Sequence, residues 1–172
     1  MKKLLIIVCT LLLSFQMMVL NVFASQDMIG KPKPVTVEST LLGKNNKTSR
    51  VSEYTSKRGD FFMGADLVIS DEGSGNVGAV AIAYLAVPAE EVYISIYLDQ
   101  YDEKADAWRQ VAYHEAEFYA EDYPEGLNDP SVNITFQKVP KGHYYRLRGA
   151  FSAVKDSQFE GFSPVTDGIW IE

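Results

Sequence analysis

Cysteine and histidine are scarce in this sequence, and their scarcity removes several kinds of chemistry. The one cysteine, Cys9, lies in the apolar N-terminal stretch, and the only histidines are His114 and His143. One thiol cannot form an internal disulfide or a thiolate zinc site. A serine-type hydrolase needs a histidine beside an activated nucleophile, and the sequence has no G-x-S-x-G motif. The sequence therefore predicts no catalytic residue, no metal ligand and no cofactor.

Basic residues are also few relative to acidic ones. The chain has 16 Lys and Arg against 23 Asp and Glu, which gives a formal net charge of -7. Nucleic-acid binding needs a basic surface, so this balance argues against a nucleic-acid partner. Hydrophobic residues make up 47% of the chain, which is typical of a folded globular protein and not of a disordered one.

The N-terminus carries a hydrophobic run, and residues 1–24 have the features of a secretory signal peptide. Lys2 and Lys3 precede an apolar run over residues 4–13, and Ala24 places a small side chain at the expected cleavage position. The alternative is a retained membrane anchor. Polar residues inside the stretch and directly after Ala24 favour cleavage. We therefore expect a secreted, extracellular protein that has no membrane span after cleavage.

Charge divides the rest of the chain in two. Residues 25–58 hold seven basic and three acidic residues, whereas residues 59–172 hold seven basic and twenty acidic ones. The first segment is rich in Lys, Ser, Thr and Asn and includes a Lys-Pro-Lys-Pro run, so it can bury little apolar surface. The sequence predicts a flexible basic arm or linker at 25–58, with room for a short edge strand at 35–37 or 41–42. An acidic folded domain follows at 59–172.

A basic arm on an acidic domain suggests two roles. The arm could hold the protein on an anionic cell-wall polymer by charge. It could equally be a solvated spacer that partly neutralises the acidic domain, and this is the interpretation that we favour. Attachment through the arm would weaken steeply with added salt.

From Phe61 onward the apolar residues alternate with a period of two, which is typical of strands. In the first strand Phe61, Met63 and Ala65 share the apolar face, and the second strand is apolar on both faces, which predicts a central, covered strand. The predicted strands are 61–70, 77–87, 92–98, 108–118, 132–136, 144–153 and 169–171. About seven short strands without a long amphipathic helix predict an all-β antiparallel β-sandwich, with a single β-barrel as the alternative.

The fourth of these strands changes phase along its length. Val111 is at an odd position, whereas Ala116 and Phe118 are at even positions. One regular strand cannot turn both sets toward a single core, so it needs an extra residue. The sequence predicts a β-bulge near His114 and Glu115.

Several short segments resemble a known family. They are Arg58-Gly59, the strand of residues 75–85, the run of residues 94–98 followed by Trp108, and residues 166–169. In these segments the chain resembles a family of small secreted proteins from Gram-positive anaerobes that is defined only as a domain of unknown function. The resemblance covers roughly residues 58–172. It implies a secreted, β-rich bacterial domain and no catalytic residue.

Two acidic segments are candidates for calcium, because this ion takes several oxygen ligands from adaptable loops. The first contains Asp99, Asp102, Glu103 and Asp106, and the second contains Glu121, Asp122, Glu125, Asn128 and Asp129. Neither has EF-hand spacing, and we favour the interpretation that both are simply solvated. Zinc has weaker support, because residues 114 and 117 point to opposite faces of a strand.

Three tyrosines suggest a surface for sugar rings. Tyr93 and Tyr97 lie on the face opposite the apolar one in the strand at 92–98, and Tyr144 begins a later strand. Together they could form a flat stacking platform. Cross-strand pairing on a solvent-facing surface explains the same tyrosines, and we favour it.

These features together predict a secreted, non-enzymatic β-sandwich that binds an extracellular surface, either a polysaccharide such as a cell-wall polymer or a protein. One alternative is a small secreted hydrolase that uses two carboxylates. Another is a self-assembling matrix subunit that pairs through exposed strand edges. The sequence identifies neither the ligand nor the ligand-binding residues, and it leaves the oligomeric state open.

Overall fold

The structure is a computed structural model that describes residues 33–54 and 61–172. The predicted signal peptide and residues 25–32 of the predicted arm lie outside the described residues. The strands are β1 (Lys33–Val35), β2 (Thr48–Tyr54), β3 (Phe62–Gly73), β4 (Asn76–Leu85), β5 (Glu91–Asp102), β6 (Ala107–Tyr119), β7 (Ser131–Phe136), β8 (His143–Lys155), β9 (Gln158–Phe162) and β10 (Ile169–Ile171). A single short 3₁₀ helix in this part of the chain, η1 (Ala120–Asp122), follows β6. Across these residues, no helix has the length and apolar character needed to cross a membrane.

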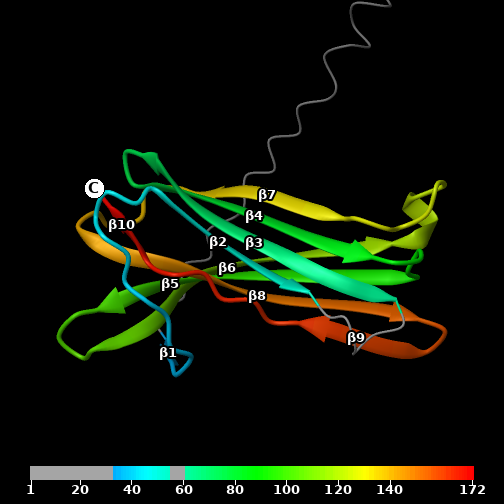
Figure 1. Cartoon of the computed structure of the whole chain (residues 1–172). Coiled ribbons are helices and arrows are strands. Elements are labelled where there is room, and N and C mark those ends of the chain that lie inside the picture. The colour runs from blue at the N-terminus through cyan, green and yellow to red at the C-terminus, as the bar shows by residue number, and fades with distance from the viewer. Residues whose placement is uncertain (1–32, 55–60) are drawn as a thin grey trace, which may run out of the picture.

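The strands form two antiparallel sheets that face each other (Figure 1). The large sheet has the order β1-β6-β5-β8-β10, with β9 also paired to β8, and the small sheet has the order β2-β3-β4-β7. The predicted all-β antiparallel sandwich is confirmed. The alternative of a single barrel is wrong, because the two sheets do not close on each other. Three strands beyond the predicted seven, β1, β2 and β9, lie at the margins of the sheets.

The core lies between the two sheets and is made by the alternating positions of each strand. On β5 the side chains of Val92, Ile94, Ile96 and Leu98 are all 0% exposed, as the alternation predicts. They face the small sheet, where β4 contributes small side chains. The fully buried residues of that strand are Val77, Ala79, Ala81 and Ala83. Burying each large aliphatic side chain contributes about 1.5–3 kcal/mol relative to leaving it in water.

A β-bulge does occur in β6, but not where the sequence predicts it. Leu98 pairs with Ala112 and Asp99 pairs with Gln110, so Val111 is the extra residue. From Ala112 to Tyr119 the ladder is regular, and the predicted position at His114 and Glu115 is therefore wrong. The bulge lies earlier because it turns both Val111 and Ala112 into the core.

A second bulge corrects the prediction for β3. Phe62 pairs with Leu85 and Gly64 pairs with Tyr84, so Met63 is an extra residue and is 47% exposed. Met63 therefore does not share the apolar face with Ala65. The bulge allows both Phe62 and Ala65 to face the core.

β4 is central in the small sheet, as predicted, because it pairs with both β3 and β7. The prediction that its second face is covered is wrong. Val80, Ile82 and Tyr84 on that outer face are only half-buried. Next to them the buried carboxylate of Asp66 accepts a hydrogen bond from the hydroxyl of Tyr84 at 2.8 Å and forms an ion pair with Arg50.

Residues 33–54 belong to the sandwich, which corrects the prediction of a flexible arm that ends at residue 58. β1 pairs with the free edge of β6, and β2 pairs with β3 along all seven of its residues. Between them, residues 36–42 pass over the outer face of the large sheet to a bridge between Leu41 and Gly168. We call residues 36–42 the crossing segment (Figure 1).

Candidate functional site

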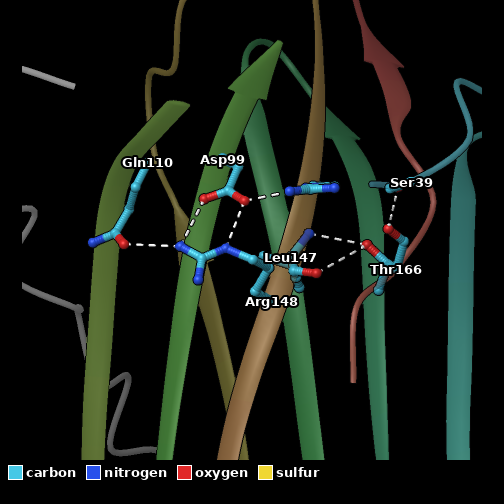
Figure 2. A network of polar contacts seen from close by, with 7 residues as sticks. Ser39, Asp99, Gln110, Leu147, Arg148 and Thr166 are labelled. Atoms are coloured by element: carbon cyan, nitrogen blue, oxygen red, sulfur yellow. Dashed lines mark hydrogen bonds and ion pairs between the residues drawn. The ribbon is translucent and has the colours of Figure 1, made fainter. Parts of the chain in front are cut away.

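A polar network lies on the outer face of the large sheet, and Figure 2 shows its side chains together with Ser39 of the crossing segment and Thr166. The carboxylate of Asp99 on β5 accepts hydrogen bonds from Nε of Arg148 at 2.7 Å and from Nε of Arg146 at 3.1 Å, both on β8. Nη2 of Arg148 also reaches Asp99, at 3.1 Å, and Oε1 of Gln110 on β6, at 2.9 Å. The register brings these groups together, because Asp99 is the cross-strand partner of both Arg146 and Gln110.

This network is buried and holds two cations against one carboxylate. The side chains of Asp99 and Arg146 are 0% exposed, and that of Arg148 is 19% exposed. Among the described residues, no group accepts a hydrogen bond from Nη1 or Nη2 of Arg146. Burial lowers the pKa of Arg146, and the charge of Asp99 opposes this shift. The Arg146 guanidinium packs instead on the ring of Trp108, with 4.4 Å between Cζ and the ring centroid.

Hydrogen bonds fix the crossing segment over this network. The hydroxyl of Ser39 donates to the carbonyl oxygen of Thr166 at 2.7 Å, and the amide of Leu42 donates to the carbonyl oxygen of Gly168 at 2.9 Å. Thr166 is itself attached to β8, because its hydroxyl accepts a hydrogen bond from the amide of Leu147 at 2.9 Å (Figure 2). The segment is therefore part of the packed structure and not a loose cover.

A depression of about 530 Å³ lies between the crossing segment and the end of the β5–β6 hairpin. The rings of Tyr101 and Trp108 belong to its lining, and their centroids are 5.2 Å apart. The other lining residues are Thr36, Val37, Glu38, Ser39, Leu41, Asp106 and Ala107. We call it the first depression.

A second depression of about 470 Å³ lies at the end of the same hairpin, on the opposite face of the large sheet. Its lining combines charged and polar side chains from the hairpin with residues at the start of β8. They are Gln100, Tyr101, Asp102, Glu103, Lys104, Arg109, Gly142 and His143. Asp102 and Arg109 pair on the face opposite the rings of Tyr101 and Trp108, so the strands of the hairpin separate the two depressions. We call the first depression, with the ring of Tyr101 in its lining, the Tyr101 groove.

The two depressions differ in charge. The lining of the first depression contains Glu38 and Asp106 and no basic residue. In the second depression Arg109 donates to Asp102 at 2.8 Å, and this hydrogen bond is the main cause that lowers the pKa of Asp102. The hydroxyl of Tyr101 donates to Asp106, and this bond raises the pKa of Tyr101 together with burial and the negative charges nearby.

The three tyrosines of the predicted platform do not form one surface. Tyr93 donates to Glu91, Tyr97 lies beside Arg148, and Tyr144 packs edge-on against Trp170. Tyr93 pairs with residue 152 of β8, eight positions along that strand from Tyr144. At about 3.3 Å per residue, roughly 26 Å separates the two levels. The favoured interpretation of local pairing describes these rings better than a platform does.

The acidic calcium candidates do not converge on a common point. β5 continues to Asp102, so the first acidic segment is largely strand rather than loop. Asp99 turns to the buried arginines, Asp102 pairs with Arg109, and Asp106 accepts from Tyr101. The acidic side chains of the second segment, which begins in η1, are exposed. In the described part of the chain, no three His, Cys, Asp or Glu residues are grouped closely enough to hold a metal ion.

The two histidines lie apart. His114 is on β6 at a half-buried position where burial lowers its pKa and the charge of Glu115 opposes the shift. His143 begins β8 and lines the second depression. His143 therefore lies on the face of the sheet opposite the ring of Tyr101, and neither histidine lines the first depression.

Sequence reasoning missed Tyr101 and Arg146 as site residues. The acidic composition of residues 99–107 predicts a loop there, although Tyr101 continues the odd-numbered series of Tyr93 and Tyr97 on one face of the strand. Arg146 and Arg148 occupy alternating positions of one strand, which places two cations on the same face. These two patterns were the available signals. Comparison with known protein families and with curated proteins finds no match to this chain. The resemblance to a family of small secreted proteins therefore stays a prediction.

Proposed function

We propose that this protein is an extracellular, non-enzymatic binding module that holds one chain of a polysaccharide in the Tyr101 groove. The observation that carries the proposal is the ring of Tyr101 in the lining of a depression of about 530 Å³ that also contains the ring of Trp108. A polysaccharide is a row of rings, so one sugar unit can lie against the aromatic side chain while the rest of the chain continues along the surface. Aromatic rings offer a flat apolar surface with large contact area.

The polar lining of the groove suits the hydroxyl groups of sugars. Carboxylates such as Asp106 and Glu38 accept hydrogen bonds from hydroxyl donors, and charged acceptors form stronger bonds than neutral ones. Few polar groups placed around an apolar floor are typical of small-molecule sites. Trp108 is held between Arg146 and the chain at Gly168, so the floor is formed before a ligand arrives. Preorganisation of this kind reduces the entropy lost on binding.

The groove gives less support to the alternative of a carboxylate hydrolase. Glycoside hydrolysis needs one carboxyl group whose raised pKa keeps it protonated as the general acid. Arg109 instead lowers the pKa of Asp102 in the second depression. Asp106 is engaged by the hydroxyl of Tyr101. These contacts favour holding a chain over cleaving it.

Affinity electrophoresis through gels that contain soluble polysaccharides tests the proposal. We expect retardation by at least one polymer, and we expect Tyr101→Ala to weaken that binding by about tenfold or more, which corresponds to about 1.4 kcal/mol. Tyr101→Phe keeps the ring and should retain most of the affinity. Tyr93→Ala, on the same outer face but outside the groove, is the matched control. The proposal fails if no polymer retards the protein, or if Tyr101→Ala binds as well as the unaltered chain.

A further inference from the structure

The first depression has an excess of negative charge that no basic residue in its lining balances. Its two carboxylates, Glu38 and Asp106, come from the crossing segment and from the β5–β6 turn. Asp106 has a neutral partner, the hydroxyl of Tyr101, and Glu38 is exposed. Among the described residues, no ion pair involves either carboxylate. Any ligand in the depression therefore lies close to two negative charges.

We infer that the polysaccharide held in the Tyr101 groove carries free amino groups, and that the first depression binds one ammonium group between Glu38 and Asp106. This inference rests on the proposed function and names its ligand class. A cavity with two carboxylates and an aromatic wall matches a cationic sugar in three respects: charge, hydrogen-bond acceptors and an apolar face. A neutral sugar would leave both carboxylates without a charged partner.

The rings of Trp108 and Tyr101 have different roles in the first depression. The face of Trp108 already holds the guanidinium of Arg146 at 4.4 Å, so its electrostatic attraction for a second cation is reduced. Tyr101 is the ring that remains for the ligand. The hydrogen bond to Asp106 and burial raise the pKa of Tyr101, and the negative charges of Asp106 and Glu103 add to this shift. The same charges attract a nearby cation.

The second depression offers no comparable site for a cation. Asp102 is paired with Arg109, and the charge of Lys104 stands beside that of Glu103. Its lining has as many basic as acidic side chains, and it lies on the opposite face of the sheet. The ammonium group therefore binds in the first depression.

Soluble oligomers of glucosamine, compared with the fully N-acetylated oligomers of the same length, test the inference by titration calorimetry with the full chain. We expect the amino form to bind at least about tenfold more tightly at low ionic strength and to lose most of this preference at high salt. Glu38→Gln should reduce the preference, and the double variant Glu38→Gln with Asp106→Asn should abolish it. Binding of the N-acetylated form should fall much less than binding of the amino form, because Gln and Asn still accept hydrogen bonds from sugar hydroxyl groups. Glu115→Gln, an exposed position outside the groove, is the matched control.

The outcomes separate the inference from the proposed function. Equal binding of the two oligomers, or a preference that survives Glu38→Gln and the double variant, overturns the inference and leaves the proposed function standing. If no polysaccharide of any kind binds, the proposed function fails and the inference falls with it. Polylysine serves as a further probe, because a peptide also presents ammonium groups. Polylysine binding that depends on Glu38 while the glucosamine oligomers do not bind would overturn the ligand class.

Discussion

The guanidinium of Arg146 packs on the ring of Trp108 at 4.4 Å, and its Nε donates a hydrogen bond to the carboxylate of Asp99 at 3.1 Å. Trp108 in turn lines the first depression. A buried ion pair therefore supports the aromatic floor of the groove from below. Asp99 forms ion pairs with both Arg146 and Arg148. Removing the charge of Asp99 therefore leaves two cations without their partner, whereas removing Arg146 leaves Asp99 paired with Arg148. The two substitutions should have very different effects on stability.

Asp99→Asn should destabilise the fold severely. The substitution removes the one negative charge that faces Arg146 and Arg148, and Arg146 has no contact with water. Breaking a buried pair by removing one partner costs about 3–5 kcal/mol, because the remaining charge stays buried. Urea unfolding followed by circular dichroism measures the change.

Asp102→Asn is the control for that experiment. Its ion pair with Arg109 has side chains that are 33% and 34% exposed, so water screens it. Exposed pairs contribute between about 0 and 1 kcal/mol. Equal losses for Asp99→Asn and Asp102→Asn would contradict the argument from burial.

Arg146→Met should have a small effect, although Arg146 belongs to the same buried pair. Asp99 keeps two hydrogen bonds to Arg148, so its charge stays compensated. The substitution also removes two buried Nη groups that have no partner, each of which costs about 1–3 kcal/mol. This gain offsets two losses: the contact with Trp108, which is worth about 2 kcal/mol, and the hydrogen bond to Asp99, which is worth about 1.5–3 kcal/mol. We expect the free energy of unfolding to change by less than about 1 kcal/mol. A loss as large as that of Asp99→Asn would show that Arg146 is essential to the network.

Gly168→Ala should loosen the crossing segment. A Cβ at this position would lie 2.7 Å from Cη2 of Trp108 and 3.2 Å from a methyl carbon of Leu41, so the ring and the crossing segment would have to separate. Overpacking of this kind costs about 1–3 kcal/mol. Thermal unfolding measures the loss, with Gly43→Ala as the control. The nearest atom to a Cβ at residue 43 is the end of the flexible Asn46 side chain at 3.4 Å, so a similar loss there would argue against steric contact as the cause.

Stability should fall in alkaline solution partly through Tyr84. Burial, the hydrogen bond to Asp66 and the charge of Asp66 raise the pKa of Tyr84 from 10.0 to about 12. The unfolded chain therefore loses this proton first as the pH rises. The contribution of Tyr84 is fully present below pH 10 and is lost between pH 10 and about 12. In urea unfolding across this range, Tyr84→Phe should show a shallower decline than the unaltered chain. Parallel declines would contradict this assignment.

Local alternation was enough to predict the layers of the fold. The inward set from Val92 to Leu98 is apolar at every second position, and burial between two sheets requires that pattern. The pattern does not predict strands that are stabilised mainly by backbone pairing with a neighbouring strand rather than by buried apolar side chains. The inward residues of β2 are Ser49, Val51 and Glu53, and only one of them is hydrophobic. Its register with β3 makes it a strand.

The candidate site was beyond sequence reasoning for a related reason. Asp99 meets Arg146 across 47 residues of sequence, and their proximity depends on which strands are neighbours. The alternation of apolar and polar residues along a strand gives no information about the order of the strands in a sheet. A polar residue after Leu98 also resembles the start of a loop. Asp99, the residue in question, stays in the strand because the crossing segment covers that face. Nothing in the local sequence of residues 36–42 indicates that this segment covers a sheet.

A chain that begins at residue 59 should fold much less stably than one that begins at residue 33. The shorter chain lacks β2, so β3 becomes a free edge along seven positions. It also lacks the crossing segment, which exposes Trp108 and the guanidinium of Arg146 to water and removes the hydrogen bonds to Thr166 and Gly168. Unpaired edges promote association, so the shorter chain should also aggregate.

Circular dichroism melting and size-exclusion chromatography measure both effects. We expect the chain from residue 33 to unfold cooperatively as a single species, and the chain from residue 59 to melt at a clearly lower temperature and to elute as larger species. Equal melting temperatures would show that residues 33–54 are dispensable for the fold. In that case the segment would act as an arm after all, and any binding that it confers could be separated from the sandwich.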